Sequence, residues 1–559
     1  MNTYTVLLNG TIILMIAIFI RHSLYRARYF LHMFQQAGYK TNEYRSWISR
    51  NFSSKTITSE HILFNLVILA MLYYLSERVT LTAGTIVIGT FALFWFLGVS
   101  RYTGTQEKKP LVYTPRLKRL GITLLIILCL LWYKLIYFAF NVLQLGDFVD
   151  PFVSTDPYFL GFGLVLTDML VPLLLYISAW LMKPVEKTIQ NGFKNQARKK
   201  LASLPHLKVI AITGSYGKTS TKFVIDTFLK ERIKVCVTPG SYNTPMGICK
   251  VINNDLEAHH QVLILEMGAR YKGNIKELCD IARPDVSVIT NVGISHLETF
   301  GSIEAVADEK STLAKEVKPG GTLVLNADDL LVKQMASLRS DVKTVFAGTG
   351  GTIQAEDIHV GPEGTSFLMK WLNDSLKTEH EEKITTPLLG AHNIQNILLA
   401  AAVARQFNIR LKTLAIAASA MEPVEHRLEL KERDELTVID DAFNSNPIGA
   451  KNAVDILASF KEGRKILITP GMIELGEREE TENKKFGEHI GRANLDLVIL
   501  VGKGQTRPIQ DGIKSTENGK NMDVRLADSL FEANDILKEF AGPGDVVLYE
   551  NDLPDMYNE

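Results

Sequence analysis

Apolar residues are unevenly distributed along this chain, and most of them are gathered before residue 185. Five apolar runs there are long enough, or nearly long enough, to cross a bilayer, which takes about 20 residues of helix. They lie near residues 4–20, 61–76, 81–100, 120–143 and 158–182. We therefore predict a multi-pass α-helical membrane domain with five helices over residues 1–185.

Basic residues between the runs indicate the orientation of these spans, because cytoplasmic links are enriched in Lys and Arg. The segments after the first, third and fifth runs are basic, whereas the link after the second has only Arg78 and the link after the fourth has no Lys or Arg. This predicts a cell-membrane protein with its N-terminus outside and its later domains in the cytoplasm. Aromatic and basic residues within 21–58 indicate a helix lying on the membrane surface, with a solvated loop as the alternative.

Two charged residues fall inside the last two runs. An unpaired charge in the bilayer costs at least about 2.5–3.5 kcal/mol on insertion scales. Lys134 and Asp168 lie at matching depths when counted from the link between their runs, so we predict that they form an ion pair. The alternative is that Lys134 reaches outward and Asp168 lines a polar cavity.

A different pattern begins after residue 204, where short apolar strands alternate with helical segments. The first strand covers 208–212, and a second alternating region begins near residue 436. This alternation is typical of mostly parallel sheets covered by helices on both faces. We predict a basic linker at 186–204, a central α/β domain at 205–425 and a Rossmann-like α/β domain at 426–559.

Composition removes several classes of function. The chain has 61 basic and 61 acidic residues, so no strong positive field favours a nucleic acid as partner. None of the four cysteines belongs to a Cys-x-x-Cys pair, which favours buried, reduced thiols over a disulfide framework or a zinc site.

A glycine-rich loop follows the strand 208–212 and leads directly into a helical stretch. It consists of Gly214, Ser215, Tyr216, Gly217, Lys218, Thr219 and Ser220. Such a loop binds phosphate through backbone N–H groups, while its Lys reaches the terminal phosphates and its Thr hydroxyl holds magnesium. Ile212 stands where the common eight-residue form has its first Gly, so a plain glycine-rich turn beside a surface Lys stays an alternative.

Two further residues predict a magnesium site beside this loop, since Mg²⁺ requires several oxygen-rich ligands. Glu266 ends the strand 262–265, and His296 follows the strand 286–290. The carboxyl ends of parallel strands meet at one edge of a sheet, where ligands gather.

These residues, together with others, resemble the Mur ligase family. The matching stretches are TGSYGKTSTK (213–222), EMGAR (266–270), NVGISHLETFGS (291–302), NADD (326–329), GAHNIQN (390–396), EHRLEL (425–430), IDDAFNSNP (439–447) and PGMIELGE (470–477). The likeness is greatest to members that add D-alanyl-D-alanine to a UDP-linked muramoyl tripeptide. It covers roughly residues 205–550.

The resemblance implies an ATP-dependent, ADP-forming carbon–nitrogen ligase. A carboxylate attacks the γ-phosphate of ATP, and an amine then displaces phosphate from the acyl phosphate. Such chemistry depends mainly on cations and donors placed around the reacting groups.

The resemblance also assigns roles to individual residues. Lys218, Glu266, His296 and Lys310 match catalytic positions. The matching ligands of two magnesium ions are Thr219, Glu266 and His296, with Lys310 supporting the second ion after carbamylation; a solvated helix lysine is the alternative for Lys310. Nucleotide contacts are implied for Asn396, Arg427 and Asp441, and substrate contacts for Asn243, Thr244, Asn444 and Asn446. Asn393 matches a family asparagine, and His392 is predicted to be a helix-capping residue.

Two departures from the family pattern bear on the substrate. The family's UDP-binding domain is missing between the last apolar run and the phosphate loop, and its basic closing motif is replaced by the acidic segment 549–555. We therefore expect an acid substrate that is held at the membrane, with a lipid as its possible carrier. The second substrate would be the amine of an amino acid or a dipeptide. The reaction would belong to cell-envelope or peptidoglycan-related precursor synthesis. The alternatives are a poly-γ-glutamate-type polymer synthase, a membrane ATPase that drives transport, a non-catalytic scaffold, and spans that dock a protein partner.

Overall fold

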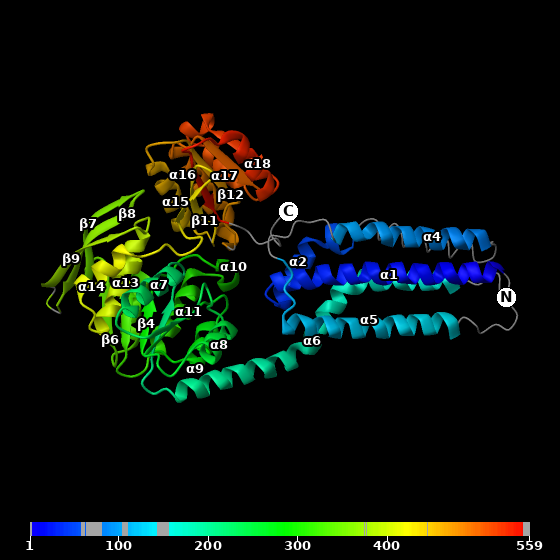
Figure 1. Ribbon diagram of the computed structural model, residues 1–559, viewed down its shortest axis with the longest axis horizontal. Helices are drawn as coiled ribbons and strands as arrows, with labels where there is room; N and C mark the ends of the chain where they lie inside the picture. Colours follow the sequence, from blue (N-terminus) through cyan, green and yellow to red (C-terminus); the bar gives the residue numbers. More distant parts are fainter. Residues whose placement is uncertain are drawn as a thin grey trace. The chain divides into compact units, whose positions relative to one another are not determined.

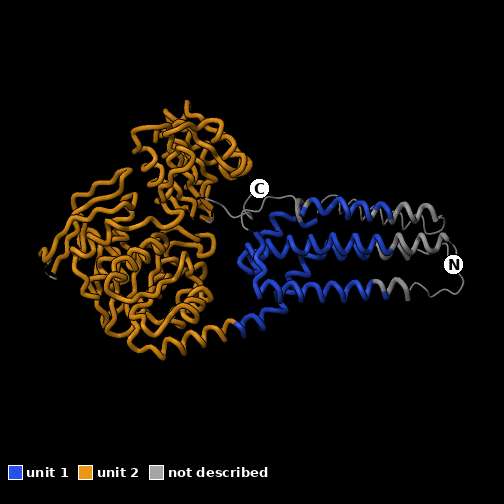
Figure 2. The backbone as a smooth tube through the Cα atoms, in the orientation of Figure 1, with its two compact units in different colours: residues 1–189, 553–558 blue, residues 190–552, 559 orange. Residues whose placement is uncertain are grey.

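The computed structural model describes residues 3–57, 62, 81–102, 110–141, 156–373, 375, 377–443, 445–473 and 475–551. The chain forms two compact units that divide between residues 189 and 190 (Figure 2). We call them the helical unit and the α/β unit.

The helical unit consists of long helices (Figure 1). Their apolar side chains form one core. Its elements are α1 (Thr3–Gln36), α2 (Thr41–Arg50), the π-helix η1 (Phe52–Thr56), α4 (Leu81–Gly98), the 3₁₀ helix η2 (Val99–Tyr102), α5 (Pro115–Asn141) and α6 (Asp156–Ala202). Four of the predicted apolar runs fall largely within α1, α4, α5 and α6, and the run 61–76, apart from residue 62, lies outside the described residues. The predicted linker 186–204 is largely the C-terminal part of α6.

The surface helix predicted within 21–58 is not a separate element at its start, because α1 continues through Gln36. Phe30 and Phe34 pack in the same core as Phe19, so burying them favours continuation of the helix. The chain then forms α2, which buries Tyr44 and Trp47.

The predicted ion pair between Lys134 and Asp168 is wrong. Asp168 is fully buried and faces α1, with its carboxylate 3.3 Å from Nε2 of His22 and 3.7 Å from Nε of Arg26. Ser23 donates a hydrogen bond of 3.5 Å to the same carboxylate. The side chain of Lys134 is exposed instead. Counting residues from the link between two helices says nothing of which face of each helix a residue occupies.

One helical stretch among the described residues, Gly163–Ala202, is long enough and apolar enough to cross a membrane when judged by length and composition. It contains most of the fifth predicted run. The other spans stay a prediction.

The α/β unit contains two sheets. The first has nine strands in the order β2-β3-β1-β4-β5-β6-β7-β8-β9. They are β1 (Lys208–Thr213), β2 (Val235–Val237), β3 (Val262–Glu266), β4 (Val286–Ile289), β5 (Thr322–Asn326), β6 (Lys343–Ala347), β7 (Ile353–Gly361), β8 (Gly364–Leu372) and β9 (Thr378–Thr386). Strands β1 to β6 are parallel, as predicted, but β7, β8 and β9 pair antiparallel to one another.

Alternating residues of β1 face two separate cores, which explains why helices cover both faces. Ile210 and Ile212 pack with helices α7, α13 and α14, whereas Val209 and Ala211 pack with α8, α9 and α11. The helices here are α7 (Lys218–Lys230), α8 (Pro245–Asn254), α9 (Asn274–Ile281), α10 (Leu297–Phe300), α11 (Ile303–Lys315), α12 (Leu330–Gln334), the 3₁₀ helix η3 (Met335–Leu338), α13 (His392–Gln406) and α14 (Leu411–Ser419).

The second sheet has six strands in the order β10-β11-β15-β12-β13-β14. They are β10 (Glu429–Arg433), β11 (Leu436–Asp441), β12 (Lys465–Thr469), β13 (Leu497–Val501), β14 (Asp523–Ala527) and β15 (Val546–Glu550), accompanied by α15 (Pro447–Ser459), η4 (Gly476–Arg478), α16 (Glu479–Arg492), α17 (Arg507–Lys514), η5 (Asn518–Asn521) and α18 (Leu530–Phe540). All pairings are parallel except β10 with β11. The two predicted α/β domains are thus confirmed.

Candidate functional site

The glycine-rich loop lies where β1 ends and α7 begins, as the sequence predicts. Gly217 is the N-cap of α7, with φ 74° and ψ −4°, a left-handed conformation that L side chains rarely adopt. A Cβ at this position would also lie 2.5 Å from Oδ1 of Asn396. Both the backbone and the close approach therefore require glycine, and the free N–H groups at the start of α7 remain available for an anion.

The segment after β4 holds the loop in place. Ser215 accepts a hydrogen bond of 2.8 Å from the N–H of Gly293 and donates one of 3.1 Å to its carbonyl. The N–H of Tyr216 donates to Oδ1 of Asn291 at 2.8 Å, and Thr290 donates to the Tyr216 carbonyl at 2.6 Å. The hydrogen bonds of Ser215 and Tyr216 to the segment 290–293 thus hold the phosphate loop in its conformation.

A buried carboxylate stands beside the loop. Glu266, at the end of β3, is 1% exposed, and its Oε2 accepts a hydrogen bond of 2.8 Å from the Thr219 hydroxyl. Its other oxygen accepts from Nδ2 of Asn243 at 3.0 Å. The structure therefore joins two of the predicted magnesium ligands. These two adjoining oxygens belong to the donor class that Mg²⁺ prefers, so the residues fit the ion.

Basic side chains surround this one carboxylate. The Lys218 ammonium donates to the carbonyls of Gly214 and Ser215 at 2.8 and 3.0 Å. Lys222, which is fully buried, lies 3.6 Å from Glu266 and also donates to the Gly240 carbonyl. Burial lowers the pKa of Lys222 to about 8, although Glu266 opposes this shift. The excess of cations suits a polyphosphate.

Lys310 is also buried, at 4% exposure, on α11. Burial lowers its pKa well below the ordinary value, and the nearby charge of Lys218 acts in the same direction, while Glu309 opposes both. A lowered pKa favours the neutral, nucleophilic amine, which is the form that carbamylation requires. The alternative of a solvated lysine is wrong.

Arg427 of the C-terminal domain reaches the same place. Its Nη2 donates a hydrogen bond of 3.3 Å to the Thr219 hydroxyl, and its guanidinium lies 4.8 Å from the ring centroid of Phe443. Asp441, the last residue of β11, accepts from the N–H of Leu428 at 3.2 Å. Burial raises the pKa of Asp441 well above its ordinary value, the carboxyl of Glu550 raises it further, and Arg427 opposes both. Residues from both α/β domains therefore meet at the phosphate loop.

The remaining predicted residues have more varied surroundings. Asn396 is buried beneath the loop, where it accepts from Thr221 at 3.1 Å and donates to Asn393 at 3.0 Å. His296 is the N-cap of α10, with φ 57°. Ser220 lies within the first turn of α7, with its side chain half-buried.

Two predicted substrate contacts are helix caps. Thr244 accepts from the N–H of Gly247 at 3.2 Å at the start of α8, and Asn446 accepts from the N–H of Gly449 at 2.9 Å at the start of α15. Both bonds satisfy helix N–H groups that would otherwise lack partners. Asn444 lies outside the described residues.

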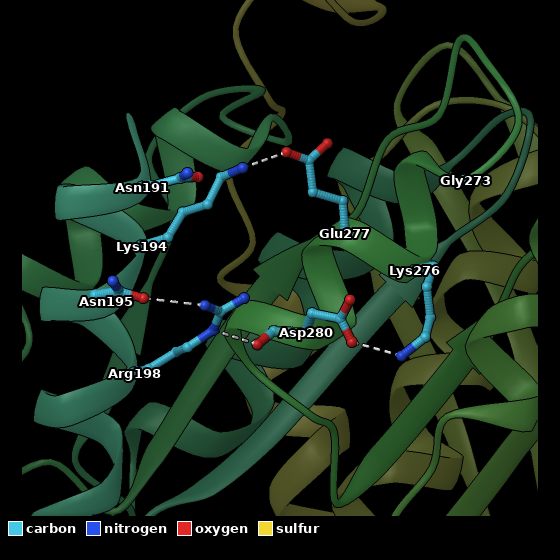
Figure 3. Close-up of a pocket in the computed structure, with 8 residues that line it drawn as sticks. All are labelled: Asn191, Lys194, Asn195, Arg198, Gly273, Lys276, Glu277 and Asp280. Carbon is cyan, nitrogen blue, oxygen red and sulfur yellow. Dashed lines mark hydrogen bonds and ion pairs between the residues drawn. The ribbon is translucent and has the colours of Figure 1, made fainter. Parts of the chain in front are cut away.

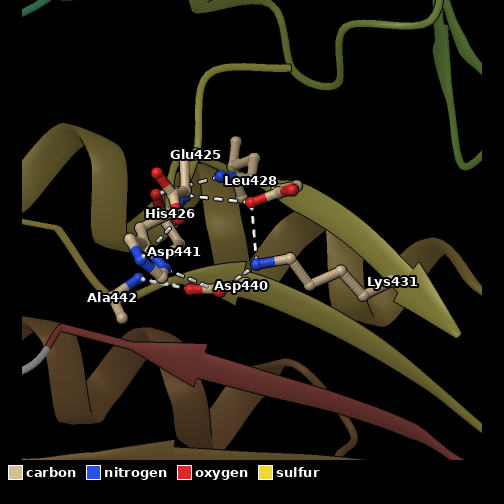
Figure 4. A network of polar contacts seen from close by, with 8 residues as sticks. Glu425, His426, Leu428, Lys431, Asp440, Asp441 and Ala442 are labelled. Atoms are coloured by element: carbon tan, nitrogen blue, oxygen red, sulfur yellow. Dashed lines mark hydrogen bonds and ion pairs between the residues drawn. The ribbon is translucent and has the colours of Figure 1, made fainter. Parts of the chain in front are cut away.

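A polar network positions the turn that carries Arg427 (Figure 4). His426 and Lys431 both contact Asp440, at 2.8 and 2.7 Å, and Lys431 also lies 2.8 Å from Glu429. This cluster has the residue types of a metal site. The Lys431 ammonium already forms ion pairs with both carboxylates, so we interpret the network as structural.

The acidic closing segment does not face a substrate at Glu550, its first acidic residue. Glu550 is fully buried and accepts hydrogen bonds from the hydroxyls of Thr469 and Ser445. Residues 552–555 lie outside the described part of the chain.

His392 is not the N-cap of α13, because Ala391 occupies that position. His392 is the first residue of the helix, and burial lowers its pKa to about 4.

A polar cavity of about 470 Å³ lies apart from this site, between the C-terminal part of α6 and α9 (Figure 3). Its cations are already paired: Lys194 lies 2.5 Å from Glu277, and Lys276 lies 2.5 Å from Asp280. Nε of Arg198 donates to the Asp280 carbonyl at 2.7 Å. These bonds fasten the end of α6, from residue 190 onward a part of the α/β unit, to α9.

Lys222 is the main residue of the site that sequence reasoning did not identify. It lies one helical turn after Lys218 on α7, which was a usable signal, because residues four apart share a helix face.

The comparisons with known proteins agree with this geometry. Residues 212–404 match the Mur ligase middle domain, and residues 426–549 match the Mur ligase glutamate ligase domain. A UDP-N-acetylmuramoyl-tripeptide–D-alanyl-D-alanine ligase of Bacillus subtilis is 32% identical over 345 residues, which cover 61% of this chain and 72% of that protein. Its counterpart from Mycobacterium tuberculosis is 35% identical over 311 residues, or 54% of this chain and 59% of that protein.

Solved structures extend the likeness to the fold. A MurF ligase of Thermotoga maritima, in complex with ADP, is similar with a TM-score of 0.57 and 26% identity, over 66% of this chain and 81% of that one. A MurF structure from Acinetobacter baumannii has a TM-score of 0.58 at 22% identity, over 65% and 77% of the two chains.

Proposed function

This chain belongs to the Mur ligase family of ATP- and Mg²⁺-dependent, ADP-forming amide ligases, and we propose that it joins a membrane-held acid to an amine at the cytoplasmic membrane surface. The pathway we propose is peptidoglycan-related precursor synthesis, because the relatives are named for the ligation of D-alanyl-D-alanine to a UDP-linked muramoyl tripeptide.

The observation that carries the ligase chemistry is the convergence of Lys218, Thr219 and Glu266 with Arg427. Lys218 and the N–H groups at the start of α7 bind the terminal phosphates of ATP. Arg427 adds a second positive charge from the other domain, next to Thr219. Clustered cations of this kind stabilise the negative charge that develops when a carboxylate attacks a phosphoryl group. A scaffold without catalytic activity gains nothing from three buried or half-buried cations, those of Lys218, Lys222 and Arg427, around one carboxylate.

Thr219 and Glu266 would hold a magnesium ion, and the buried amine of Lys310, whose pKa is lowered, would be the site of the carbamylation that supports a second one. When bound, magnesium neutralises phosphate charge and orients the phosphoryl group. Asn243 holds the Glu266 carboxylate in place through a hydrogen bond of 3.0 Å, and Lys222 does so through an ion pair of 3.6 Å.

The distribution of polarity in the helical unit supports a membrane location. Large apolar side chains are more than half exposed on each of its four long helices: Leu14 58%, Leu93 57%, Ile126 54% and Leu173 52%. The interior, by contrast, holds the charged groups of Arg26 and Asp168, both fully buried. In water this arrangement would be unusual, because apolar residues are normally inside and charged residues outside. In lipid it is the expected one.

The proposed substrate follows from this location. Within the described stretch 156–373, α6 ends at Ala202 and β1 begins at Lys208, which leaves no room there for a domain that grips a soluble nucleotide handle. Confining the acid and the enzyme to one membrane surface would raise their effective concentration without such a handle. We therefore propose that the acid is carried by a lipid and that the N-terminus lies outside, with the α/β unit in the cytoplasm.

The test compares two acids with the intact protein in vesicles: a UDP-linked muramoyl peptide and its lipid-linked equivalent. The proposal predicts efficient amide formation with the lipid-linked acid. Equal or better ligation of the UDP-linked acid would show that the helical unit has another task, such as docking a protein partner. Products longer than a single addition would identify a polymer synthase.

A further inference from the structure

Two carboxyl groups end neighbouring strands of the second sheet. Asp441 ends β11 and Glu550 ends β15, and the two residues are direct partners in the parallel pairing of these strands. Glu550 is completely buried. Among the described residues, Asp441 is the charged group beside it, while the other elements present the hydroxyls of Ser445 and Thr469.

The carboxylate of Glu550 connects three segments. Its Oε2 accepts a hydrogen bond of 2.5 Å from Thr469 at the end of β12, and its Oε1 accepts from Ser445, in the segment after β11. Asn551 repeats the connection, because it accepts from the N–H of Ser445 at 3.3 Å and donates to the Gly471 carbonyl at 2.6 Å. The two acceptor oxygens of the carboxylate match the two hydroxyl donors, and a lysine at this position would offer no acceptor.

The segment fastened in this way leads to the phosphate loop. It begins at Asp441, whose charge acts on Arg427, and it contains Phe443, whose ring lies against the Arg427 guanidinium. Arg427 in turn donates to the Thr219 hydroxyl. Glu550 touches neither the loop nor Arg427 in these contacts, so any effect on the nucleotide must pass through this segment.

We propose that Glu550 is a positioning residue of the ligase: it clamps the segment after β11 to the end of β12, and so holds Asp441 and Phe443 where Arg427 reaches Thr219. The proposal rests on the ligase function. The clamp is strongest when the carboxylate is ionised, because both oxygens then accept a hydroxyl hydrogen. Burial raises the pKa of Glu550 to about 7, although the bonds from Ser445 and Thr469 lower it. Ionisation therefore strengthens the two hydroxyl bonds as pH rises through neutrality, while the burial of the charge lowers the stability of the sheet.

The experiment measures ATP affinity by titration, without acid or amine, in the full-length protein between pH 5.5 and 9. Glu550→Ala removes the clamp, and Thr469→Val removes one of its bonds with little change of shape. We expect each to weaken ATP binding at pH 8, about tenfold for Glu550→Ala, which corresponds to the loss of about one net hydrogen bond. Thr506→Val is the matched control, since Thr506 is equally buried but bonds to the Gly502 carbonyl, away from the site.

Glu550→Gln separates positioning from mere packing. Its amide can still bond to both hydroxyls, so we expect ATP binding within about threefold of wild type at pH 6, but without the wild-type inflection near pH 7. Wild-type affinity at pH 8 in Glu550→Ala and Thr469→Val, or an unchanged inflection in Glu550→Gln, would overturn the proposal. ATP binding needs neither acid nor amine, so a failure to find ligation would count against the ligase function alone.

Discussion

The carboxyl group of Glu550 should make the second sheet less stable as pH rises, and Glu550→Gln should remove this effect. Its pKa is raised from an ordinary 4.5 to about 7 in the folded chain, chiefly by burial. Because the folded value is above the unfolded one, the unfolded chain loses its proton first. The penalty is absent below about pH 4.5, grows between pH 4.5 and 7, and is complete above pH 7.

The magnitude follows from the difference of about 2.5 between the two pKa values. Each pKa unit corresponds to 1.36 kcal/mol, so the penalty reaches about 3 kcal/mol at pH 8 and is under about 1 kcal/mol at pH 5. Glu550 is 0% exposed, so solvent screening does not reduce this figure much. The glutamine keeps the shape of the side chain and cannot ionise.

The assay is amide hydrogen exchange in β12 and β15 of the full-length protein, with wild type and variant compared at the same pH. At pH 8 these amides should exchange about a hundredfold more slowly in Glu550→Gln, and at pH 5 the two proteins should differ by a small factor. Glu539→Gln, an exposed position on α18, is the control. Equal protection at pH 8, or faster exchange in Glu550→Gln, would refute the reasoning.

Further predictions concern both units. Lys218→Ala should lower ATP-dependent ligation by at least about a hundredfold, because it removes a charge from the phosphates, while circular dichroism stays unchanged. Glu266→Gln should raise the Mg²⁺ concentration needed for half-maximal activity; an unchanged requirement would contradict its role as a ligand. Asp168→Asn should destabilise the helical unit by about 3–5 kcal/mol, since it leaves Arg26 without its buried counter-charge, whereas Lys134→Gln should hardly change thermal unfolding in detergent. His392→Gln should reduce the loss of stability between pH 6.5 and 4. The folded pKa of about 4 keeps the His392 ring neutral, while the unfolded chain binds a proton in this range. At pH 4 the free energy of unfolding lost from pH 7 should be about 2 kcal/mol smaller in the variant than in wild type, after allowance for screening.

The phosphate loop and the parallel strands could be predicted because their signals are local. Buried strands such as β1 and β3 are short apolar runs in the sequence. Gly217 followed by Lys218 indicates the start of a helix that binds phosphate. The antiparallel strands around β8 are harder to predict from the sequence. Only alternate residues, such as Phe367 and Met369, are buried there, so no apolar run marks the strand.

Side-chain partners could not be read from the sequence in the same way. Asp168 lies against α1 and not α5, because helix rotation decides which face of α6 meets which neighbour. Thr244 and Asn446 match a family pattern, but that pattern does not separate a cap from a substrate contact. The acidic closing segment suggested a reversed charge facing the substrate, whereas Glu550 points inward to two hydroxyls that are distant in sequence.

The most direct test of the ligase assignment is the release of ADP and phosphate by the purified full-length protein, with a lipid-linked acid, an amine, ATP and Mg²⁺ in vesicles. The account predicts that ADP, phosphate and amide appear in equal amounts, that omitting the acid or the amine stops amide formation, and that Lys218→Ala gives none of the three. Steady ATP hydrolysis that depends on neither acid nor amine would instead indicate a membrane ATPase and would contradict the central claim.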